Sequence, residues 1–388
     1  GLGNIDSIAP VVSMFFLISY GLLNYATYAE ARANSPSFRP RFRYFHARLS
    51  LLGGVVCLGA ILAIHPLAGA VALAVIFAIH QYLSRTVKVE RWADSDRARR
   101  FQRVREDLLA ISADLEHPLN WRPVLLAFSD SEKRRRRLLR FASWLEGKSG
   151  LSTIVRIIAE QGPRTRRTQD ETLKALKAEI DRQKLPAFPR VIVAKDPEAA
   201  APVLIQAHGL GPVRANTVLL NWYELRSDYG EPGLRTYGRY LRQGLRDGCN
   251  LVLLAAGPDE FPTLEQIRPS DRRIDVWYRD DATGRLCLLL AYLVTRAERW
   301  HGARIRLLAA ARVGQDGEEA LQELKQMLED VRITAEPLIV DDPGHEAIVR
   351  ESAGSQLVFL PFRLTGDGPT AIHVGPLDDT LRQLGVTA

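Results

Sequence analysis

Three stretches in the first quarter of the chain combine high apolar content with almost no charge. They cover residues 8–28, 49–64 and 67–83, and only His65 and Pro66 separate the last two. Crossing a bilayer takes about 20 apolar residues, with a range of roughly 17 to 25. A helix of a soluble protein would show a polar face, which these stretches lack. We therefore predict that residues 1–84 form three transmembrane helices, although the two shorter stretches also fit a buried hairpin of a soluble protein.

Basic residues flank the apolar stretches on one side. Arg39, Arg41 and Arg43 lie between the first and second stretch, more Arg and Lys follow Leu83, and the His-Pro link has neither. By the positive-inside rule both basic sides face the cytoplasm. This predicts a multi-pass protein of the cell membrane whose remaining chain forms a cytoplasmic domain.

The formal charge of +7 is compatible with an anionic partner. Because much of the arginine borders the apolar stretches, anionic lipid is the expected partner. No zinc-finger, RNA-binding or helix-turn-helix signature is present, so nucleic acid is not expected.

Small residues recur at four-residue spacing in the second and third stretches. Such faces let helix backbones approach closely, either within a hairpin or between two copies. Alanine is common in any membrane helix, so helix packing and a homodimer interface both stay open as interpretations. The candidate packing residues are Ser50, Gly53, Gly54, Cys57, Ala70, Ala74 and Ala78.

The segment 85–118 is predicted to contain an amphipathic helix. Phe101, Val104, Leu108 and Ile111 recur every three or four residues, and arginines surround them. We interpret the helix as a connector beside the membrane. The alternative is an ordinary first helix of the soluble domain.

Short apolar strands alternate with helices after residue 119. This alternation predicts a doubly wound, mostly parallel sheet, arranged as two half-domains at 119–256 and 257–388. The expected strands are Val124–Phe128, Thr153–Ile158, Arg190–Val193, Thr217–Leu220, Leu251–Leu254, Ile274–Trp277, Ile305–Ala309, Ala335–Val340 and Gln356–Leu360, and the expected helices include Thr168–Gln183, Leu286–Arg299 and Glu318–Val331.

Two glycine-rich segments are candidates for a phosphate-binding loop. Gly209 and Gly211 precede a strand and are interpreted as a turn, because a phosphate loop must lead into a helix. Gly366, Gly368 and Gly375 precede a predicted helix and form a weak nucleotide-binding candidate, since no lysine follows them. No other cofactor is expected.

The remaining polar residues do not predict catalysis. The histidines occur singly, no HExxH, GxSxG or P-loop pattern is present, and the three cysteines are far apart. The basic run Lys133–Arg137 is interpreted as a solvated helix face or an anionic-lipid contact. We expect neither a metal site nor an enzyme.

Several segments together resemble the cation-chloride cotransporters. Their residues agree with the family in order and spacing: Ile8-Ala9-Pro10, Met14–Leu17, Ser19–Asn24, Ser35–Phe45 and Leu49–Gly53, then Leu119–Pro123, His208–Trp222, Arg272–Tyr278 and Leu286–Val294. The resemblance implies the last membrane helices of a longer transporter that moves potassium or sodium with chloride. It also implies a dimerising cytoplasmic domain similar to the universal stress proteins, with ion ligands on earlier helices. A membrane-anchored nucleotide sensor and an amino-acid permease are the alternatives.

Overall fold

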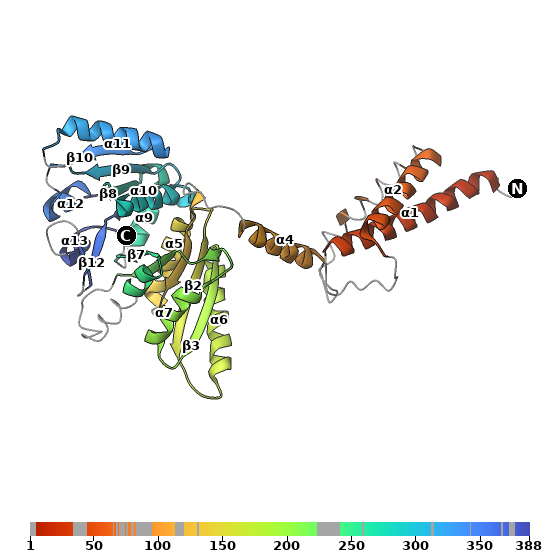
Figure 1. Ribbon diagram of the computed structural model, residues 1–388, viewed down its shortest axis with the longest axis horizontal. Helices are drawn as coiled ribbons and strands as arrows, with labels where there is room; N and C mark the ends of the chain where they lie inside the picture. The colour runs from red at the N-terminus through yellow and green to blue at the C-terminus, as the bar shows by residue number, and fades with distance from the viewer. Residues whose placement is uncertain are drawn as a thin grey trace. The chain divides into compact units, whose positions relative to one another are not determined.

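The computed structural model divides the chain into two compact units, Gly1–Asp114 and Leu115–Ala388 (Figure 1). The structure describes residues 5–33, 45–64, 95–112, 120–129, 132–222, 241–257, 260–311, 314–341, 343–365, 368–371 and 377–388, with a few isolated helical residues between 66 and 82.

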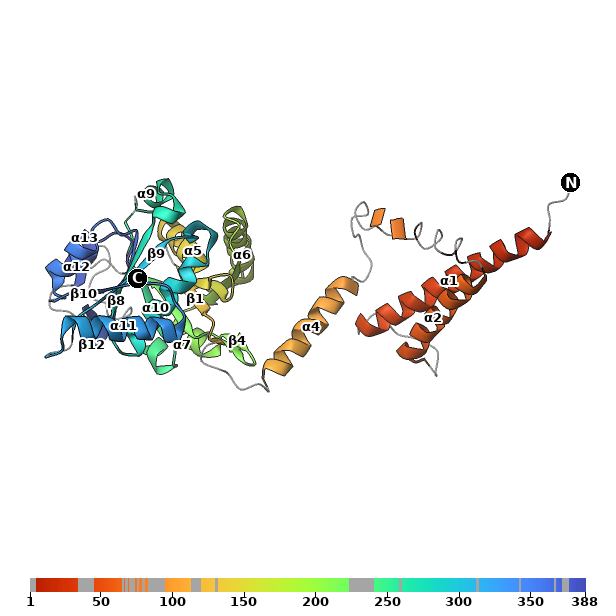
Figure 2. The same cartoon turned by 90° about the horizontal axis from the view of Figure 1, so that it is seen from above.

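The N-terminal unit contains helices α1 (Ile5–Ala33), α2 (Ala47–Ile64) and α4 (Ser95–Ile111). Helices α1 and α2 lie side by side in both views (Figures 1 and 2). Among the described residues, α2 alone is long and apolar enough to cross a bilayer, with a mean hydropathy of 2.1. Most of the stretch 67–83 lies outside the described residues. The number of membrane spans therefore stays a prediction.

The C-terminal unit begins with a parallel five-stranded sheet in the order β3-β2-β1-β6-β7. The chain moves outward from β1 to β3, then returns to the other side of β1 for β6, which makes the β1/β6 boundary a topological switch point. Its strands are β1 (Val124–Phe128), β2 (Leu151–Ala159), β3 (Ala187–Ala194), β6 (Thr217–Asn221) and β7 (Asn250–Leu254), connected in part by helices α5 (Glu132–Glu146), α6 (Thr165–Arg182) and α7 (Pro197–Ala207).

A second parallel sheet repeats this strand order as β10-β9-β8-β11. Its connecting helices cover the two faces of the sheet. Helices α10 and α11 pack on the face that belongs to the core shared by both sheets, whereas α12 packs on the outer face. The elements are α9 (Glu260–Gln266), β8 (Arg273–Tyr278), α10 (Ala282–Thr295), β9 (Arg304–Ala309), α11 (Gly317–Val331), β10 (Glu336–Ile339), α12 (His345–Glu351), β11 (Leu357–Phe359) and α13 (Leu377–Gln383).

Residues Val386–Ala388 join the two sheets. This segment pairs in parallel with β11 through Val358, and antiparallel with Ala255 just after β7. Ala255 and Thr387 exchange two backbone hydrogen bonds of 2.9 Å. The segment thus takes the place in the second sheet that β7 holds in the first. We call Val386–Ala388 the joining strand.

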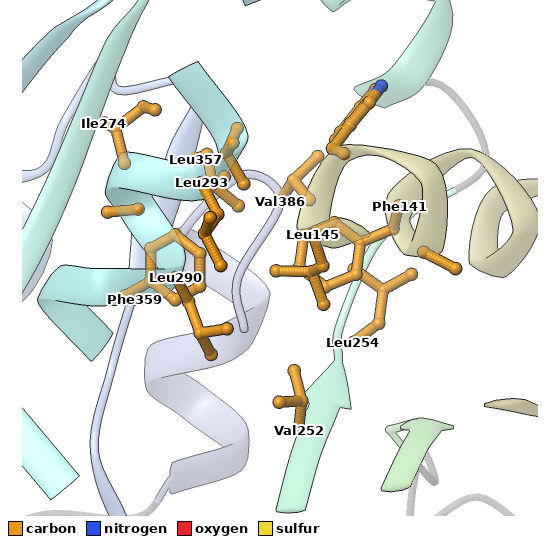
Figure 3. Close-up of a cluster of buried hydrophobic side chains, with 14 of the residues drawn as sticks. Phe141, Leu145, Val252, Leu254, Ile274, Leu290, Leu293, Leu357, Phe359 and Val386 are labelled. Atoms are coloured by element: carbon orange, nitrogen blue, oxygen red, sulfur yellow. The ribbon is translucent and has the colours of Figure 1, made fainter. Parts of the chain in front are cut away.

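One hydrophobic core runs through both halves of the C-terminal unit. Phe141 and Leu145 on α5 face Leu290 and Leu293 on α10, with Val386 of the joining strand between the two groups (Figure 3). Separate clusters fill the outer face of each sheet. The two halves therefore share the largest of the three clusters of buried residues.

All nine strands expected from the sequence are present as parallel strands, and the α/β prediction is confirmed for this unit. Two short antiparallel hairpins were not expected: β4 (Gly209–Leu210) with β5 (Val213–Arg214), and β12 (Phe362–Thr365) with β13 (Gly368–Ala371).

Candidate functional site

A cavity of about 380 Å³ opens at the carboxyl ends of β8, β9 and β10. Parallel α/β sheets bind ligands at this end, because the strands stop there and the loops diverge. Trp277 and Leu308 contribute apolar walls, Met327 comes from α11, and Asp280 and Glu323 add carboxylates. The cavity could hold a small molecule that has both an apolar and a polar part.

The loop after β8 supplies most of the charge in this cavity. Arg279 pairs with Asp281 at 3.2 Å, and Asp280 pairs with Arg285 at 3.2 Å. The Asp281 carboxylate also accepts a 2.9 Å hydrogen bond from the Gly284 amide, and Asp281 thereby caps the N-terminus of α10. These carboxylates are therefore already engaged with the protein.

Gly284 permits the sharp approach of this loop to α10. A Cβ atom at this position would lie 2.0 Å from the Arg279 carbonyl oxygen, so no other residue fits without moving the backbone. Beside it, burial raises the pKa of Tyr278, and the nearby Arg285 guanidinium opposes that shift. The hydroxyl of Tyr278 is thus neutral at physiological pH.

A buried ion pair lies on the outer face of the same sheet. Asp275 of β8 is fully buried and accepts hydrogen bonds from Arg306 of β9 at 2.9 and 2.7 Å. Its carboxylate also accepts one from the Ser355 hydroxyl at 2.5 Å, and the Arg273 guanidinium lies 3.5 Å away. Arg306 also donates a hydrogen bond of 2.5 Å to the carbonyl oxygen of Glu351. The network therefore connects the end of α12 to strands β8 and β9.

Our sequence analysis missed this network, although the sequence carries a signal for it. Asp275 interrupts the apolar strand between Ile274 and Val276, and Arg306 interrupts the next strand at the paired register position. Opposite charges at paired positions on one sheet face predict a cross-strand ion pair.

The predicted glycine site is only partly described. Gly368 lies in β13, where it pairs with Thr365 in the antiparallel hairpin that follows β11. Gly366 and Gly375 lie outside the described residues. Nucleotide binding by these glycines stays a prediction. The other candidate, Gly209 and Gly211, forms the β4–β5 hairpin before β6, which agrees with the interpretation as a turn.

The small-residue face of α2 packs against α1 in the structure. A Cβ atom on Gly53 would lie 3.0 Å from the Asn24 side chain, and one on Gly21 would lie 3.2 Å from the Cβ of Cys57. A Cβ atom on Gly54 would lie 3.5 Å from the carbonyl oxygen of Gly21 on α1. These glycines therefore allow two helix backbones to approach closely within one chain.

An apolar groove of about 300 Å³ runs between α1 and α2. Ala74 and Ala78 of the third stretch are helical and exposed, whereas Ala70 and the loop residues Arg39, Arg41 and Arg43 lie outside the described residues. The homodimer interface and the cytoplasmic loop stay predictions.

The basic run in α5 is not a fully solvated face. Arg135 is buried and pairs with Glu179 of α6 at 2.8 Å, and it is followed by the buried Leu138 and Leu139. Arg136 of the same run is exposed. At least one arginine of the run therefore serves the fold of the C-terminal unit. Among the described residues, no cluster of His, Cys, Asp and Glu has the arrangement of a metal site.

Comparison with known proteins gives a family match and a set of structural likenesses. The family model "Solute carrier family 12" matches residues 263–353, which run from α9 through α12. The crystal structure of the cytoplasmic domain of a prokaryotic cation chloride cotransporter is 13% identical, with a TM-score of 0.47, over 69% of this chain and 94% of that one. The crystal structure of GsuK bound to ADP is 12% identical, with a TM-score of 0.18, over 98% of this chain and 92% of that one. Residues 263–353 thus carry the signature of solute carrier family 12, which confirms the resemblance to the cation-chloride cotransporters that the sequence indicated.

Proposed function

We propose that the chain is the C-terminal part of a secondary active transporter that moves potassium or sodium together with chloride. The match of residues 263–353 to solute carrier family 12 is the observation that carries this proposal. The motifs in residues 8–64 support it, because they agree with the same family in a separate part of the chain.

In this proposal the present portion has scaffold, dimerisation and regulatory roles. The N-terminal unit supplies the last helices of a multi-pass membrane domain, and the exposed apolar surface of α2 supports that assignment. The C-terminal unit forms a cytoplasmic domain. Its repeated strand order supports a likeness to paired universal stress protein domains. The ion sites belong to helices that precede this sequence.

Ion flux into proteoliposomes tests the proposal. The complete protein is expected to take up labelled chloride only when potassium or sodium is also present, and to take up the cation only with chloride. The present chain, reconstituted in the same way, is the matched control and is expected to give no flux. Cation uptake that does not depend on chloride, or uptake of amino acids, would contradict the proposal and favour a permease.

A membrane-anchored nucleotide sensor is the second candidate, and the cavity at the carboxyl ends of β8–β10 favours it. Equilibrium dialysis of the chain against labelled ATP and ADP tests this function. Binding that is lost when Ala310→Trp fills the cavity would support a sensor. Absence of binding at millimolar nucleotide would remove the candidate.

A further inference from the structure

Helix α4 has an exposed apolar stripe. Phe101, Val104, Leu108 and Ile111 occupy positions i, i+3, i+7 and i+10, which fall on one side of a helix. The side chains of Phe101, Val104 and Ile111 are 72%, 56% and 50% exposed. A helix of a water-soluble domain normally buries such a stripe, so this one is expected to have a partner.

Arginines border the stripe on both sides. Arg100 lies four residues before Val104 on one edge, and Arg105 lies four residues after Phe101 on the other edge. Arg99 and Arg103 project from the other side of the helix. The face away from the stripe also carries Gln102 and Glu106, joined by a 2.7 Å hydrogen bond, whereas Asp107 lies three residues after Val104, on the same edge of the stripe as Arg100. The helix contains five Arg against the three acids Asp96, Glu106 and Asp107.

We propose that α4 lies on the surface of an anionic phospholipid membrane, with its apolar stripe at the boundary between headgroups and acyl chains. Long arginine side chains at the edges of such a stripe can reach lipid phosphates while their methylene groups remain in apolar surroundings. Charge complementarity favours this partner over a second copy of α4, because two copies of α4 carry the same net positive charge. The inference rests on the proposed function, since it requires the N-terminal unit to be in a membrane.

Site-specific fluorescence on the reconstituted chain tests the placement. A bimane label is attached at Val104→Cys, on the stripe, or at Ala110→Cys, on the opposite side, in a Cys57→Ala background. Cys249 and Cys287 are buried and stay unlabelled in the folded chain. Quenching by aqueous iodide is measured in vesicles of phosphatidylcholine with and without phosphatidylglycerol. Phosphatidylglycerol is expected to protect the label at residue 104 severalfold and to leave the label at residue 110 unchanged.

A matched pair of charge variants separates the effect of arginines at the edges of the stripe from the effect of the net charge of α4. Arg100→Gln/Arg105→Gln and Arg99→Gln/Arg103→Gln remove the same charge from α4. A basic residue near an anionic surface contributes about 1 kcal/mol to binding. Arg100→Gln/Arg105→Gln is therefore expected to lower the equilibrium constant for the membrane-bound, iodide-protected state about 30-fold. The second pair is expected to have a much smaller effect. Equal losses in the two variants would overturn the proposed orientation.

Two further outcomes distinguish this inference from the proposed function. Protection of residue 104 that is the same with and without phosphatidylglycerol would mean that the stripe is covered without anionic lipid, and it would overturn the proposal. Extraction of the whole chain from vesicles by alkaline carbonate would instead contradict the membrane placement of the N-terminal unit. An inserted chain whose residue 104 remains open to iodide would refute only the inference about α4.

Discussion

The buried ion pair between Asp275 and Arg306 gives the sharpest test of what holds the second sheet together. Asp275 accepts two hydrogen bonds from Arg306 and one from Ser355, and it is fully excluded from water. Asp275→Asn keeps the shape of the side chain but leaves the Arg306 guanidinium without its counter-charge. The side chain of Arg306 is only 16% exposed, so water cannot replace the carboxylate at low cost.

The expected loss of unfolding free energy for Asp275→Asn is about 3–5 kcal/mol, the range for removal of one partner from a buried pair. The double variant Asp275→Leu/Arg306→Met removes both charges and replaces them with apolar side chains. It is expected to recover most of the loss, because the cost of burying both charges disappears together with their attraction. The comparison therefore separates the net value of the pair from the penalty of an isolated charge.

Urea unfolding of the chain in mild detergent measures these differences. Five of the six tryptophans, all except Trp92, follow residue 119, so their fluorescence reports on the C-terminal unit. Arg140→Gln is the control, since it breaks a 2.7 Å pair with Glu265 whose side chains are about one-third exposed and is expected to cost no more than about 1 kcal/mol. An Asp275→Asn cost as small as the control would refute the reasoning, as would a double variant less stable than the single one.

Three further predictions concern the backbone. Gly284→Ala is expected to cost about 3 kcal/mol or more, because its Cβ would overlap the Arg279 carbonyl; an unchanged urea midpoint would contradict the close approach. Arg332→Gly is expected to stabilise the unit by up to about 1 kcal/mol, because Arg332 ends α11 with φ +56°; the same measurement showing a loss would mean that the arginine side chain outweighs the backbone strain. Deletion of residues 384–388 is expected to increase hydrogen exchange at the Val358 and Ala255 amides, which donate to Val386 and Thr387; retained protection would show that the joining strand is dispensable.

The sequence was sufficient to predict the long strands because each is an apolar run between polar turns. The segment Arg273–Tyr278 illustrates this, and so does the Leu-rich helix that follows it. Strands of a parallel sheet are covered by helices on both faces, so they need such continuous apolar runs. Few other structures would place short apolar runs between helices. The α/β class therefore followed from local pattern alone.

Local pattern could not predict how the two sheets join. The joining strand has only three residues, and its partners lie about 30 residues away in β11 and about 130 residues away beside Ala255. Short apolar segments of this kind are common in loops, so their pairing depends on long-range contacts. The β12–β13 hairpin was missed for a different reason. Its sequence contains Gly366-Asp367 between two short runs, a pattern of two-residue hairpin loops, but we had interpreted the glycines as a phosphate site.

The packing between the halves limits how the C-terminal unit could transmit a regulatory signal. Trp144 of α5 stacks on Phe261 of α9 at 5.1 Å between ring centroids, and it meets Trp300 edge-on at 5.3 Å. Arg272 lies over the Trp300 ring and donates hydrogen bonds to the Leu264 carbonyl, among others. Separating the halves would expose these aromatic rings, at roughly 1.5–3 kcal/mol for each large apolar side chain. Hinge opening between the halves is therefore costly, so a signal of a few kcal/mol would move the unit as one body and act through the segments that lead into it.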